Sequence, residues 1–349
     1  MTPLAHVVTI LAVLPIAHFL PPRIRLFFVT LTGAVFMLML APAGFWVVLF
    51  TIVEAMLLER LLRNLPKKSA VRQYLPYVIL LNVFTTDLAG GVFSGQRFVT
   101  AGVAFAVVRI FMTTKQLLGA KSTTAPQRIG SLAAGGWFLP AIVVGPVFSG
   151  TSLWDQTKKG ASEHVAAPTE FLYRKFFGGW VLAALASDWL VQQSGGTNLD
   201  RWTAPFVLLA LFGHLFAAFW GQSLIAESGA ALAGFEIPSN FNRPWLAVDI
   251  RDFWNRWHMS MARFVMQYFF LPLNLRGVNA RVATAVAFVF MGLWHEVRPG
   301  YLIWGLTHGL LMAFAPKSTD MSSRVARIAN RLATISAVVL LSYVANYAF

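Results

Sequence analysis

Two histidines, His258 and His295, each directly follow a tryptophan in a chain of 349 residues. His258 ends the polar and aromatic run 252–258, and His295 ends an apolar run that begins near residue 282. An ionisable side chain at the end of a membrane-buried stretch is costly to keep there, which makes it a functional-site candidate. Because a neutral imidazole accepts a proton near neutral pH, the pair predicts an acid–base centre inside a membrane protein.

Each histidine also has a structural interpretation when it is taken alone. His258 is then a packing residue with satisfied hydrogen bonds, and His295 is a helix-terminal residue that faces lipid headgroups. The matching pair of Trp-His dipeptides favours the catalytic interpretation. We expect His308 to be mainly structural, closing the helix bundle by hydrogen bonding, and we treat four others as background: His6, His18, His164 and His214.

The composition places these histidines in a membrane protein. Hydrophobic residues make up 57% of the chain, charged residues 12%, and the mean hydropathy is +0.63. Soluble domains carry about 25% charged residues. We therefore expect an all-α fold: a polytopic integral membrane bundle of about ten or eleven membrane segments of ~20 residues each, some of them re-entrant, in one domain over residues 1–349.

The apolar runs give the order of these segments. Candidate spans cover about residues 4–20, 24–42, 44–59, 74–87, 98–114, 130–148, 171–193, 203–226, 281–295, 299–315 and 331–348. The glycine pair Gly135-Gly136 and the step Gly145-Pro146 interrupt the run 130–148, which predicts a broken or re-entrant segment instead of a straight helix. The first run lacks a basic leader, so we expect a retained span and not a cleaved signal peptide.

The net charge of +14 comes largely from short loops between the apolar runs. Loops 60–72 and 115–128 are rich in Lys and Arg, which predicts that they face the cytoplasm and that 87–97 lies outside. Nucleic-acid binding needs basic residues clustered with aromatics on a soluble face, so we exclude it. The chain has no cysteine, which excludes disulfides and a thiol nucleophile, and we expect no metal site.

Residues 249–270 have the pattern of one continuous helix with two polar faces. One face carries Asp249, Asp252, Arg256, Ser260, Arg263 and Gln267, with Asp252 and Arg256 at the spacing of an ion pair. This stripe is also typical of a solvated face on a helix at the membrane interface. His258 lies on the second face with Arg251 and Asn255, which predicts that this face points at a buried pocket or a polar partner helix.

These residues resemble the signature of the membrane-bound O-acyltransferases. The likeness rests on residues 240–244 (Asn-Phe-Asn-Arg-Pro) and 249–260, and on residues 291–295 and 304–309, within a clear region of about 213–313. It is greatest toward the bacterial branch that contains the alginate O-acetylase and the D-alanyl transferase of teichoic acid synthesis. Glu296 stands where the family often has glycine after the histidine.

The resemblance implies a helical bundle that encloses a catalytic tunnel open to both membrane faces. It also implies that His295 is the catalytic residue and that His258 supports it. We expect supporting or substrate-binding roles for the residues around them: Asp252, Trp254, Asn255, Arg256, Trp257, Ser260, Trp294, Glu296 and His308.

The chemistry of such a centre would be transfer of an acyl group to a hydroxyl. A hydroxyl is a weak nucleophile, so a base must remove its proton as it attacks a thioester carbonyl. The oxyanion that forms needs hydrogen-bond donors, which we expect from N–H groups of Asn255, Arg256 and Trp257 or from His258. Because no cysteine is present, direct transfer of the acyl group to the hydroxyl is simpler than a covalent acyl-enzyme. An acyl-serine intermediate stays an open alternative.

The expected function is therefore transfer of an acetyl or another short acyl group from a cytoplasmic thioester, with no permanently bound cofactor. The donor would be acyl-CoA or an acyl carrier protein, and the acceptor a cell-surface polysaccharide, a cell-wall polymer, a lipid or a protein. The protein would be a multi-pass protein of the cytoplasmic (inner) membrane, with an extracytoplasmic acyltransferase as a partner. A transporter or flippase with proton-relaying histidines, or a membrane scaffold, are the alternatives.

Overall fold

The computed structural model describes residues 2–84, 97–158, 169–186, 204–315 and 323–347. Every regular element in these ranges is a helix, which confirms the predicted all-α class. The contacts divide the chain into two compact units: residues 1–181 with 221–238, and residues 182–220 with 239–349. The prediction of a single domain stays a prediction.

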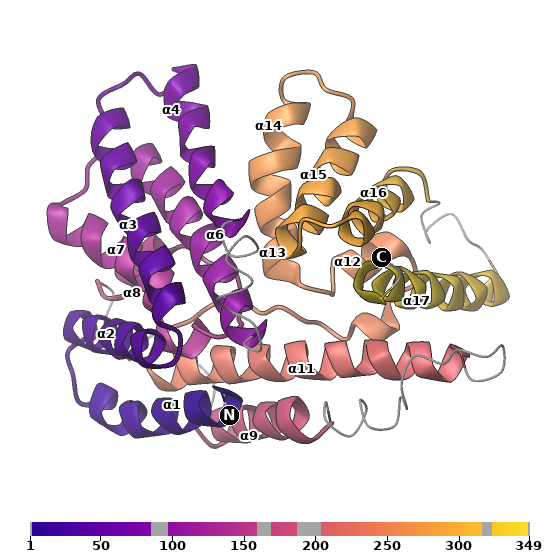
Figure 1. Cartoon of the computed structure of the whole chain (residues 1–349), viewed down its shortest axis with the longest axis horizontal. Helices are drawn as coiled ribbons and strands as arrows, with labels where there is room; N and C mark the ends of the chain where they lie inside the picture. Colours follow the sequence, from indigo (N-terminus) through magenta and orange to yellow (C-terminus); the bar gives the residue numbers. More distant parts are fainter. Residues whose placement is uncertain (1, 85–96, 159–168, 187–203, 316–322, 348–349) are drawn as a thin grey trace. The chain divides into compact units, whose positions relative to one another are not determined.

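The first unit is built mainly from apolar helices. Its elements are α1 (Thr2–His18), α2 (Pro22–Leu40), α3 (Pro42–Leu62), α4 (Ala70–Tyr74), η1 (Leu75–Leu81), α6 (Arg97–Gly119), α7 (Ala125–Trp137), η2 (Leu139–Ala141), α8 (Gly150–Gln156), α9 (Thr169–Val181) and residues 221–232 of α11 (Ala204–Leu232). Helices α3, α6 and α7 pack against one another (Figure 1). Prolines at the first turn of α2 and α3 fit helix starts, because the missing N–H would have no helical partner there.

The run predicted to be broken is irregular between α7 and α8. Residues 138–150 are all buried, although only η2 within them is helical before α8 begins. Two fully buried side chains donate to carbonyls of this segment: His6 Nε2 to Leu139 O at 2.8 Å and Arg109 Nη1 to Ala141 O at 2.8 Å. Irregular backbone inside a membrane protein requires such internal partners, so His6 has a structural role that the sequence did not indicate.

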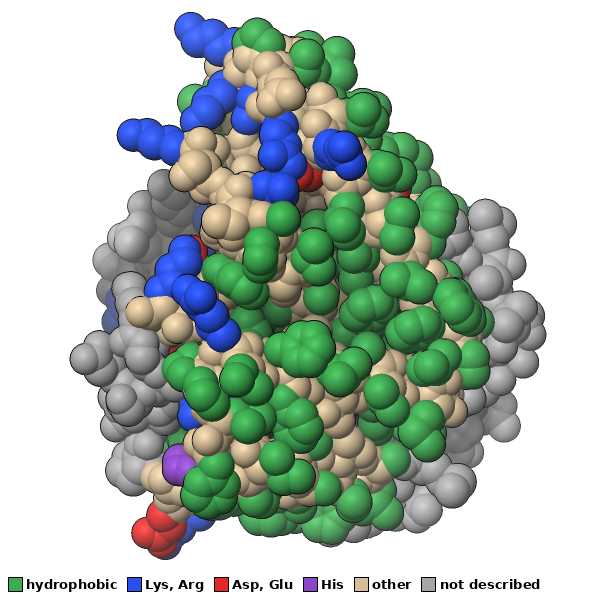
Figure 2. All heavy atoms as spheres, turned by 90° about the vertical axis from the view of Figure 1, so that its left-hand side faces the viewer, with side chains coloured by type: hydrophobic (Ala, Val, Ile, Leu, Met, Phe, Trp, Pro, Cys, Tyr) green, Lys and Arg blue, Asp and Glu red, His purple; other side chains and the backbone are tan. Residues whose placement is uncertain are grey.

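The face shown in Figure 2 is largely apolar, and most of its Lys and Arg side chains lie in the upper part, with a smaller group at the left edge. Exposed apolar side chains are frequent along α2 and α3, as in Leu38, Trp46 and Phe50. The 60–72 loop contributes exposed basic side chains, including Lys67 and Lys68. An apolar wall that ends in a basic rim is the arrangement expected for lipid contact and for a cytoplasmic end. Residues 87–96 of the loop predicted to lie outside, and His164, fall beyond the described ranges.

The second unit contains both signature regions. Its elements are η3 (Leu182–Ala186), residues 204–220 of α11, η4 (Pro244–Leu246), α12 (Ile250–Trp254), α13 (Met259–Val265), η5 (Met266–Phe270), α14 (Leu271–Asn274), α15 (Ala280–His295), α16 (Pro299–Phe314) and α17 (Arg324–Tyr347). Hydrogen bonds near both ends of helix α17 connect it to the rest of this unit. Asn330 Nδ2 donates to Val248 O at 2.8 Å, and Arg298 Nη2 donates to Ala345 O at 2.6 Å.

Glycines allow α15 and α16 to approach closely. A Cβ at Gly292 would lie 2.2 Å from Tyr301 O, and one at Gly305 would lie 2.5 Å from Phe288 O. Small residues at helix contacts let backbones pack tightly in membrane proteins. This contact fixes the position of His295, the last residue of α15, relative to α16.

Four of the described helices are long and apolar enough to cross a membrane. These stretches are Pro22–Leu40, Ala101–Gly119, Pro205–Leu232 and Arg324–Ala345. Two other predicted spans correspond to shorter apolar helices, one of which is α15 with 16 residues against the ~20 needed for a straight span. The membrane character is confirmed, and the total of ten or eleven segments stays a prediction.

Candidate functional site

The segment predicted as one helix over residues 249–270 is broken at His258. Helix α12 is capped by Asp249, whose carboxylate accepts from Asp252 N at 2.8 Å, and it ends at Trp254. A turn over 255–258 follows before α13 starts. His258 has φ 45°, a left-handed conformation that is uncommon outside glycine and asparagine-like residues and occurs often at functional sites. The prediction of a continuous helix with a long polar stripe was therefore wrong, because this turn changes the direction of the chain.

A neighbouring loop holds the turn through backbone hydrogen bonds. Met259 N donates to Asn240 O at 2.9 Å, and Asn242 N donates to Arg256 O at 2.9 Å. Asp252 and Arg256 form the predicted ion pair at 2.7 Å across the turn. The conformation of His258 is thus determined by pairing with residues 240–242, a partner that periodicity along one helix does not reveal.

Asn240 also orients the ring of His258. Its fully buried side-chain oxygen Oδ1 lies 3.3 Å from His258 Nδ1 and accepts from Ser260 Oγ at 2.5 Å. Since Oδ1 only accepts, His258 donates from Nδ1, and Nε2 is the basic nitrogen of the neutral ring. Burial lowers the pKa of His258 well below its ordinary value, and the nearby charge of His295 lowers it further. His258 is therefore neutral at physiological pH.

Aromatic side chains surround the Trp257–His258 step. Trp257 stacks on Phe253 and on Phe212, with ring centroids 5.5 Å apart in both cases, and Phe219 meets the His258 ring edge-on at 4.8 Å. Phe212, Phe216 and Phe219 lie at helical spacing on α11, and all three contact Trp257. This aromatic stripe was the sequence signal for contact between α11 and the site.

His295 is positioned by rings from α15 and α16. It stacks on Tyr301 with centroids 5.4 Å apart and an interplanar angle of 19°, and it meets Trp304 edge-on at 5.6 Å. Trp294 contacts both His295, at 4.8 Å, and His258, at 6.3 Å. His295 lies at the protein surface, whereas His258 is buried, so the two histidines differ in how accessible they are from outside the protein.

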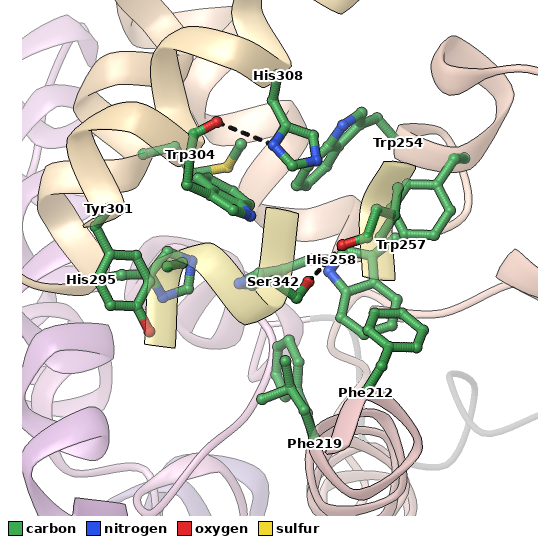
Figure 3. Close-up of a pocket in the computed structure, with 15 residues that line it drawn as sticks. Phe212, Phe219, Trp254, Trp257, His258, His295, Tyr301, Trp304, His308 and Ser342 are labelled. Atoms are coloured by element: carbon green, nitrogen blue, oxygen red, sulfur yellow. Dashed lines mark hydrogen bonds between the residues drawn. The ribbon is translucent and has the colours of Figure 1, made fainter. Parts of the chain in front are cut away.

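Both histidines line one cavity of about 90 Å³ (Figure 3). Its wall also includes Trp254, Trp257 and His308, so the three histidines come from the α12–α13 turn, the end of α15 and the middle of α16. A volume of this size has room for several water-sized groups, which is enough for a carbonyl and a hydroxyl beside the imidazoles. The structure thus brings together residues that the sequence predicted to act together.

His308 has both a structural bond and a position in the cavity wall. Its Nδ1 lies 3.0 Å from the Trp304 carbonyl oxygen, which accepts the proton. This bond within α16 agrees with the expected structural role. Its Nε2 is buried and has no hydrogen-bond partner among the described residues, so this nitrogen is available to a group in the cavity.

Several predicted supporting residues do not line this cavity: Asp252, Asn255, Arg256, Ser260, Trp294 and Glu296. The backbone N–H groups of Asn255, Arg256 and Trp257 donate to carbonyls of Arg251 and Phe253 at 2.8–3.0 Å. These backbone N–H groups are therefore engaged in the turn, and the oxyanion role expected for the three residues stays a prediction.

Glu296 points toward Arg298 in the structure. Its carboxylate lies 3.6 Å from Arg298 Nε in a partly exposed ion pair. The Arg298 guanidinium lies 5.6 Å from the centre of the Tyr301 ring, which in turn stacks on His295. Glu296 is therefore linked to the candidate base through Arg298 and Tyr301.

Asn240, Tyr301 and Phe219 were not predicted as site residues. Asn240 belongs to the first signature, so its position before the Arg-Pro step was the available signal. Tyr301 lies six residues after His295, across a turn whose geometry the sequence does not specify. Within the described ranges, no group of three His, Asp or Glu side chains is placed to hold a metal ion.

Comparison with known proteins gives the family. Residues 132–343 match the membrane-bound O-acyltransferase family. Over 156 residues the chain is 31% identical to the teichoic acid D-alanyltransferase of Bacillus subtilis. This aligned stretch is 41% of this chain and 40% of that protein. Over 200 residues it is 30% identical to the probable alginate O-acetylase of Pseudomonas aeruginosa. This stretch is 55% of this chain and 38% of that protein.

A third relative is the peptidoglycan O-acetyltransferase of Helicobacter pylori, 31% identical over 120 residues, which are 34% of this chain and 23% of that protein. The matched part spans about two-fifths of the length of the first two relatives. The family match covers well over half of the chain and includes His258, His295 and the cavity between them. The chain belongs to the membrane-bound O-acyltransferase family.

Proposed function

We propose that this multi-pass membrane protein transfers an acyl group from a thioester to a hydroxyl of a cell-surface polymer. The observation that carries the proposal is the cavity that His258 and His295 line together in a membrane-bound O-acyltransferase chain. Teichoic acid, alginate and peptidoglycan in the names of the relatives are all cell-envelope polymers, which supports an acceptor of this class.

His295 would act as the general base. As the acceptor hydroxyl attacks the thioester carbonyl carbon, its proton passes to the imidazole and a C–O bond forms. The tetrahedral intermediate then collapses, the C–S bond breaks, and the proton goes to the departing thiolate sulfur. Exposure of His295 at the cavity edge gives the two substrates access to it.

His258 would support this step from the buried side of the cavity. The Nδ1–H bond to Asn240 fixes its tautomer, so that Nε2 accepts a hydrogen bond from the attacking hydroxyl or from a bound water. Trp254, Trp257, Trp304 and Tyr301 give the cavity aromatic walls, and such walls limit the access of water that would hydrolyse the thioester.

The donor would be acyl-CoA or an acyl carrier protein, with no permanently bound cofactor. Both are acidic, and the exposed basic side chains of the 60–72 loop favour their approach by charge. We place the protein in the cytoplasmic membrane, with the acceptor on the opposite side and an extracytoplasmic acyltransferase as the partner that completes delivery.

The test uses the purified full chain in lipid vesicles with a radiolabelled acyl-CoA or acyl carrier protein and an isolated envelope polymer. We expect release of thiol in step with label on an ester of the polymer. Movement of polymer or lipid across the vesicle membrane without thioester consumption would contradict the proposal and support the transporter alternative.

A further inference from the structure

Two buried polar atoms of residues in the wall of the histidine cavity have no hydrogen-bond partner in the part of the chain that the structure describes. They are the indole nitrogen Nε1 of Trp254 and the imidazole nitrogen Nε2 of His308. Trp254 is 4% exposed and His308 is 0% exposed. Because a buried polar group without a partner costs free energy, such groups are rare in native proteins and each requires an explanation.

The two atoms have opposite hydrogen-bonding capacities. An indole nitrogen carries a hydrogen and only donates. His308 Nδ1 lies 3.0 Å from the Trp304 carbonyl oxygen, which only accepts, so Nδ1 carries the hydrogen of the neutral ring. His308 Nε2 is therefore an acceptor, and the pair offers one donor beside one acceptor.

The two rings lie next to each other in Figure 3. Their centroids are 5.4 Å apart, and the rings meet edge-on at 85°. No direct hydrogen bond joins Trp254 Nε1 to His308 Nε2. A single group between the two atoms satisfies both if it accepts from Trp254 and donates to His308.

A hydroxyl is the simplest group with this capacity, because its oxygen accepts one hydrogen bond while its hydrogen makes another. A thioester carbonyl only accepts. A trans amide directs its N–H and its C=O to opposite sides, so one amide does not meet two neighbouring atoms. The pair therefore selects a hydroxyl over the thioester and amide groups of the donor.

Trp254 and His308 lie close to the candidate base. The Trp304 ring contacts both His295 and His308, with centroids 5.6 and 4.5 Å away. All four residues line the same cavity of about 90 Å³. A sugar unit of a polysaccharide carries hydroxyls on neighbouring carbons, so one hydroxyl can face His295 while the next lies between Trp254 and His308.

We propose that Trp254 and His308 bind a second hydroxyl of the acceptor, next to the hydroxyl that receives the acyl group. The inference rests on the proposed function and narrows the acceptor to compounds with neighbouring hydroxyls, such as sugar units and other polyols. It gives His308 a role in substrate binding besides its bond within α16. The second hydroxyl takes no part in bond making or breaking, since only the first loses its proton to His295.

The first test compares three small alcohols as acceptors: ethane-1,2-diol, 2-methoxyethanol and propan-1-ol. The full chain in lipid nanodiscs is given acetyl-pantetheine, which carries the part common to acyl-CoA and carrier protein, and ester and thiol are measured. We expect kcat/KM to be at least about tenfold higher for ethane-1,2-diol than for propan-1-ol, because a site that binds a hydroxyl rejects an analogue without it. 2-Methoxyethanol keeps the second oxygen but has no second O–H for His308, so it should resemble propan-1-ol.

Two variants each remove one member of the pair. Trp254→Phe loses the donor and His308→Phe loses the acceptor, and either should reduce the ratio of the two kcat/KM values to about one. Trp137→Phe is the matched control. The Trp137 indole nitrogen is also buried and without a partner among the described residues, but Trp137 belongs to the first unit and does not line the histidine cavity. This control should keep the wild-type ratio.

Equal kcat/KM values for ethane-1,2-diol and propan-1-ol in the wild type would overturn the proposal and assign the site to a bound water. A preference for the diol that persists in both Trp254→Phe and His308→Phe would overturn it as well. Absence of ester formation with these alcohols and with the envelope polymer would instead show that the proposed function fails.

A second test does not depend on turnover. The indole N–H signals of the 12 tryptophans are recorded by NMR with nitrogen-15 tryptophan, and the signal that disappears in Trp254→Phe belongs to Trp254. Ethane-1,2-diol should shift this signal in a saturable way that propan-1-ol does not reproduce and that His308→Phe abolishes. No shift at Trp254, or the same shift with both alcohols, contradicts the site. A specific shift without ester formation would show that the diol site exists although the proposed function fails.

Discussion

At the scale of single residues, Asn240 has the most direct influence on the candidate site. It accepts from Met259 through its backbone and from Ser260 and His258 through its side chain, and it is fully buried. Removing the side-chain oxygen leaves the Ser260 hydroxyl without this acceptor and lets the His258 ring turn. Asn240 is therefore a positioning residue for His258.

The change Asn240→Ala should lower kcat for acyl transfer by roughly 10- to 100-fold with a small change in KM, because only the orientation of a supporting imidazole is lost. Steady-state kinetics with a thioester donor measure both constants. Asn242→Ala is the control, since Asn242 is exposed in the same loop and contributes only its backbone here. An unchanged kcat in Asn240→Ala would show that the orientation of His258 is irrelevant.

Glu296 and Arg298 give a second prediction at this scale. Glu296→Gln should change kcat less than about twofold, because a partly exposed ion pair at 3.6 Å contributes little. Arg298→Ala should lower kcat at least fivefold, because it removes both the bond to Ala345 O and the cation against the Tyr301 ring. The two kinetic measurements check this order, and a larger effect of Glu296→Gln would show that its carboxylate acts on His295 directly.

The residue types of the site could be predicted from the sequence, but their geometry could not. The structure places His258 and His295 at one cavity and forms the predicted Asp252–Arg256 pair, because apolar context and i,i+4 spacing are local properties. The catalytic roles of the histidines stay predictions. The turn at His258 depends on hydrogen bonds to residues 240–242, which are distant in sequence. The apparent second polar face of a continuous helix was a consequence of missing this turn.

At the scale of elements, the contact between α15 and α16 positions His295 against Tyr301 and Trp304. Gly292 is the point of closest approach, since a Cβ there would lie 2.2 Å from Tyr301 O and 3.2 Å from Gly305 Cα. Both neighbours are backbone atoms that cannot rotate away. A methyl group at residue 292 must therefore separate the helices or shift Tyr301.

We expect Gly292→Ala to reduce the free energy of unfolding by about 1–3 kcal/mol and to lower kcat as well. Thermal unfolding in detergent and the thioester assay measure the two effects. Gly178→Ala is the matched control, because it lies in α9 with open space where its Cβ would go. That variant should be neutral or slightly stabilising. If both variants unfolded at the same temperature, close helix approach would not explain Gly292.

The apolar runs in the sequence predicted the positions of the helices well. Breaks inside these runs could be predicted only where glycine and proline marked them. The predicted spans 24–42 and 299–315 correspond to α2 and α16 within about two residues. The irregular segment after α7 was indicated by its Gly-Pro step. The sequence did not indicate that His6 and Arg109 stabilise this segment, because these partners come from α1 and α6.

At the scale of the whole molecule, the distribution of charge predicts how the chain is oriented in the membrane. The 60–72 loop has exposed basic side chains and should face the cytoplasm, with the 87–97 loop on the other side. Because the natural chain has no cysteine, single substitutions report position without background. Lys68→Cys should react with a membrane-impermeant maleimide only after the cells are opened, and Gly91→Cys should react in intact cells.

The opposite labelling pattern would reverse the orientation and place the basic rim away from a cytoplasmic donor. Lys68→Cys should retain thioester consumption, since Lys68 does not line the candidate cavity. Orientation is a property of charge distribution along the chain, which is why the sequence predicts it more readily than it predicts the turn at His258.

In the proposed reaction, His295 accepts the proton of the acceptor hydroxyl during acyl transfer. The most direct measurement compares thiol release by wild type and His295→Ala in vesicles, with thermal unfolding of both proteins as the measure of folding. We predict that His295→Ala unfolds within a few degrees of wild type and loses at least ~100-fold in rate, while His258→Ala is strongly impaired but retains measurable turnover. Wild-type rates in a folded His295→Ala protein would contradict the account.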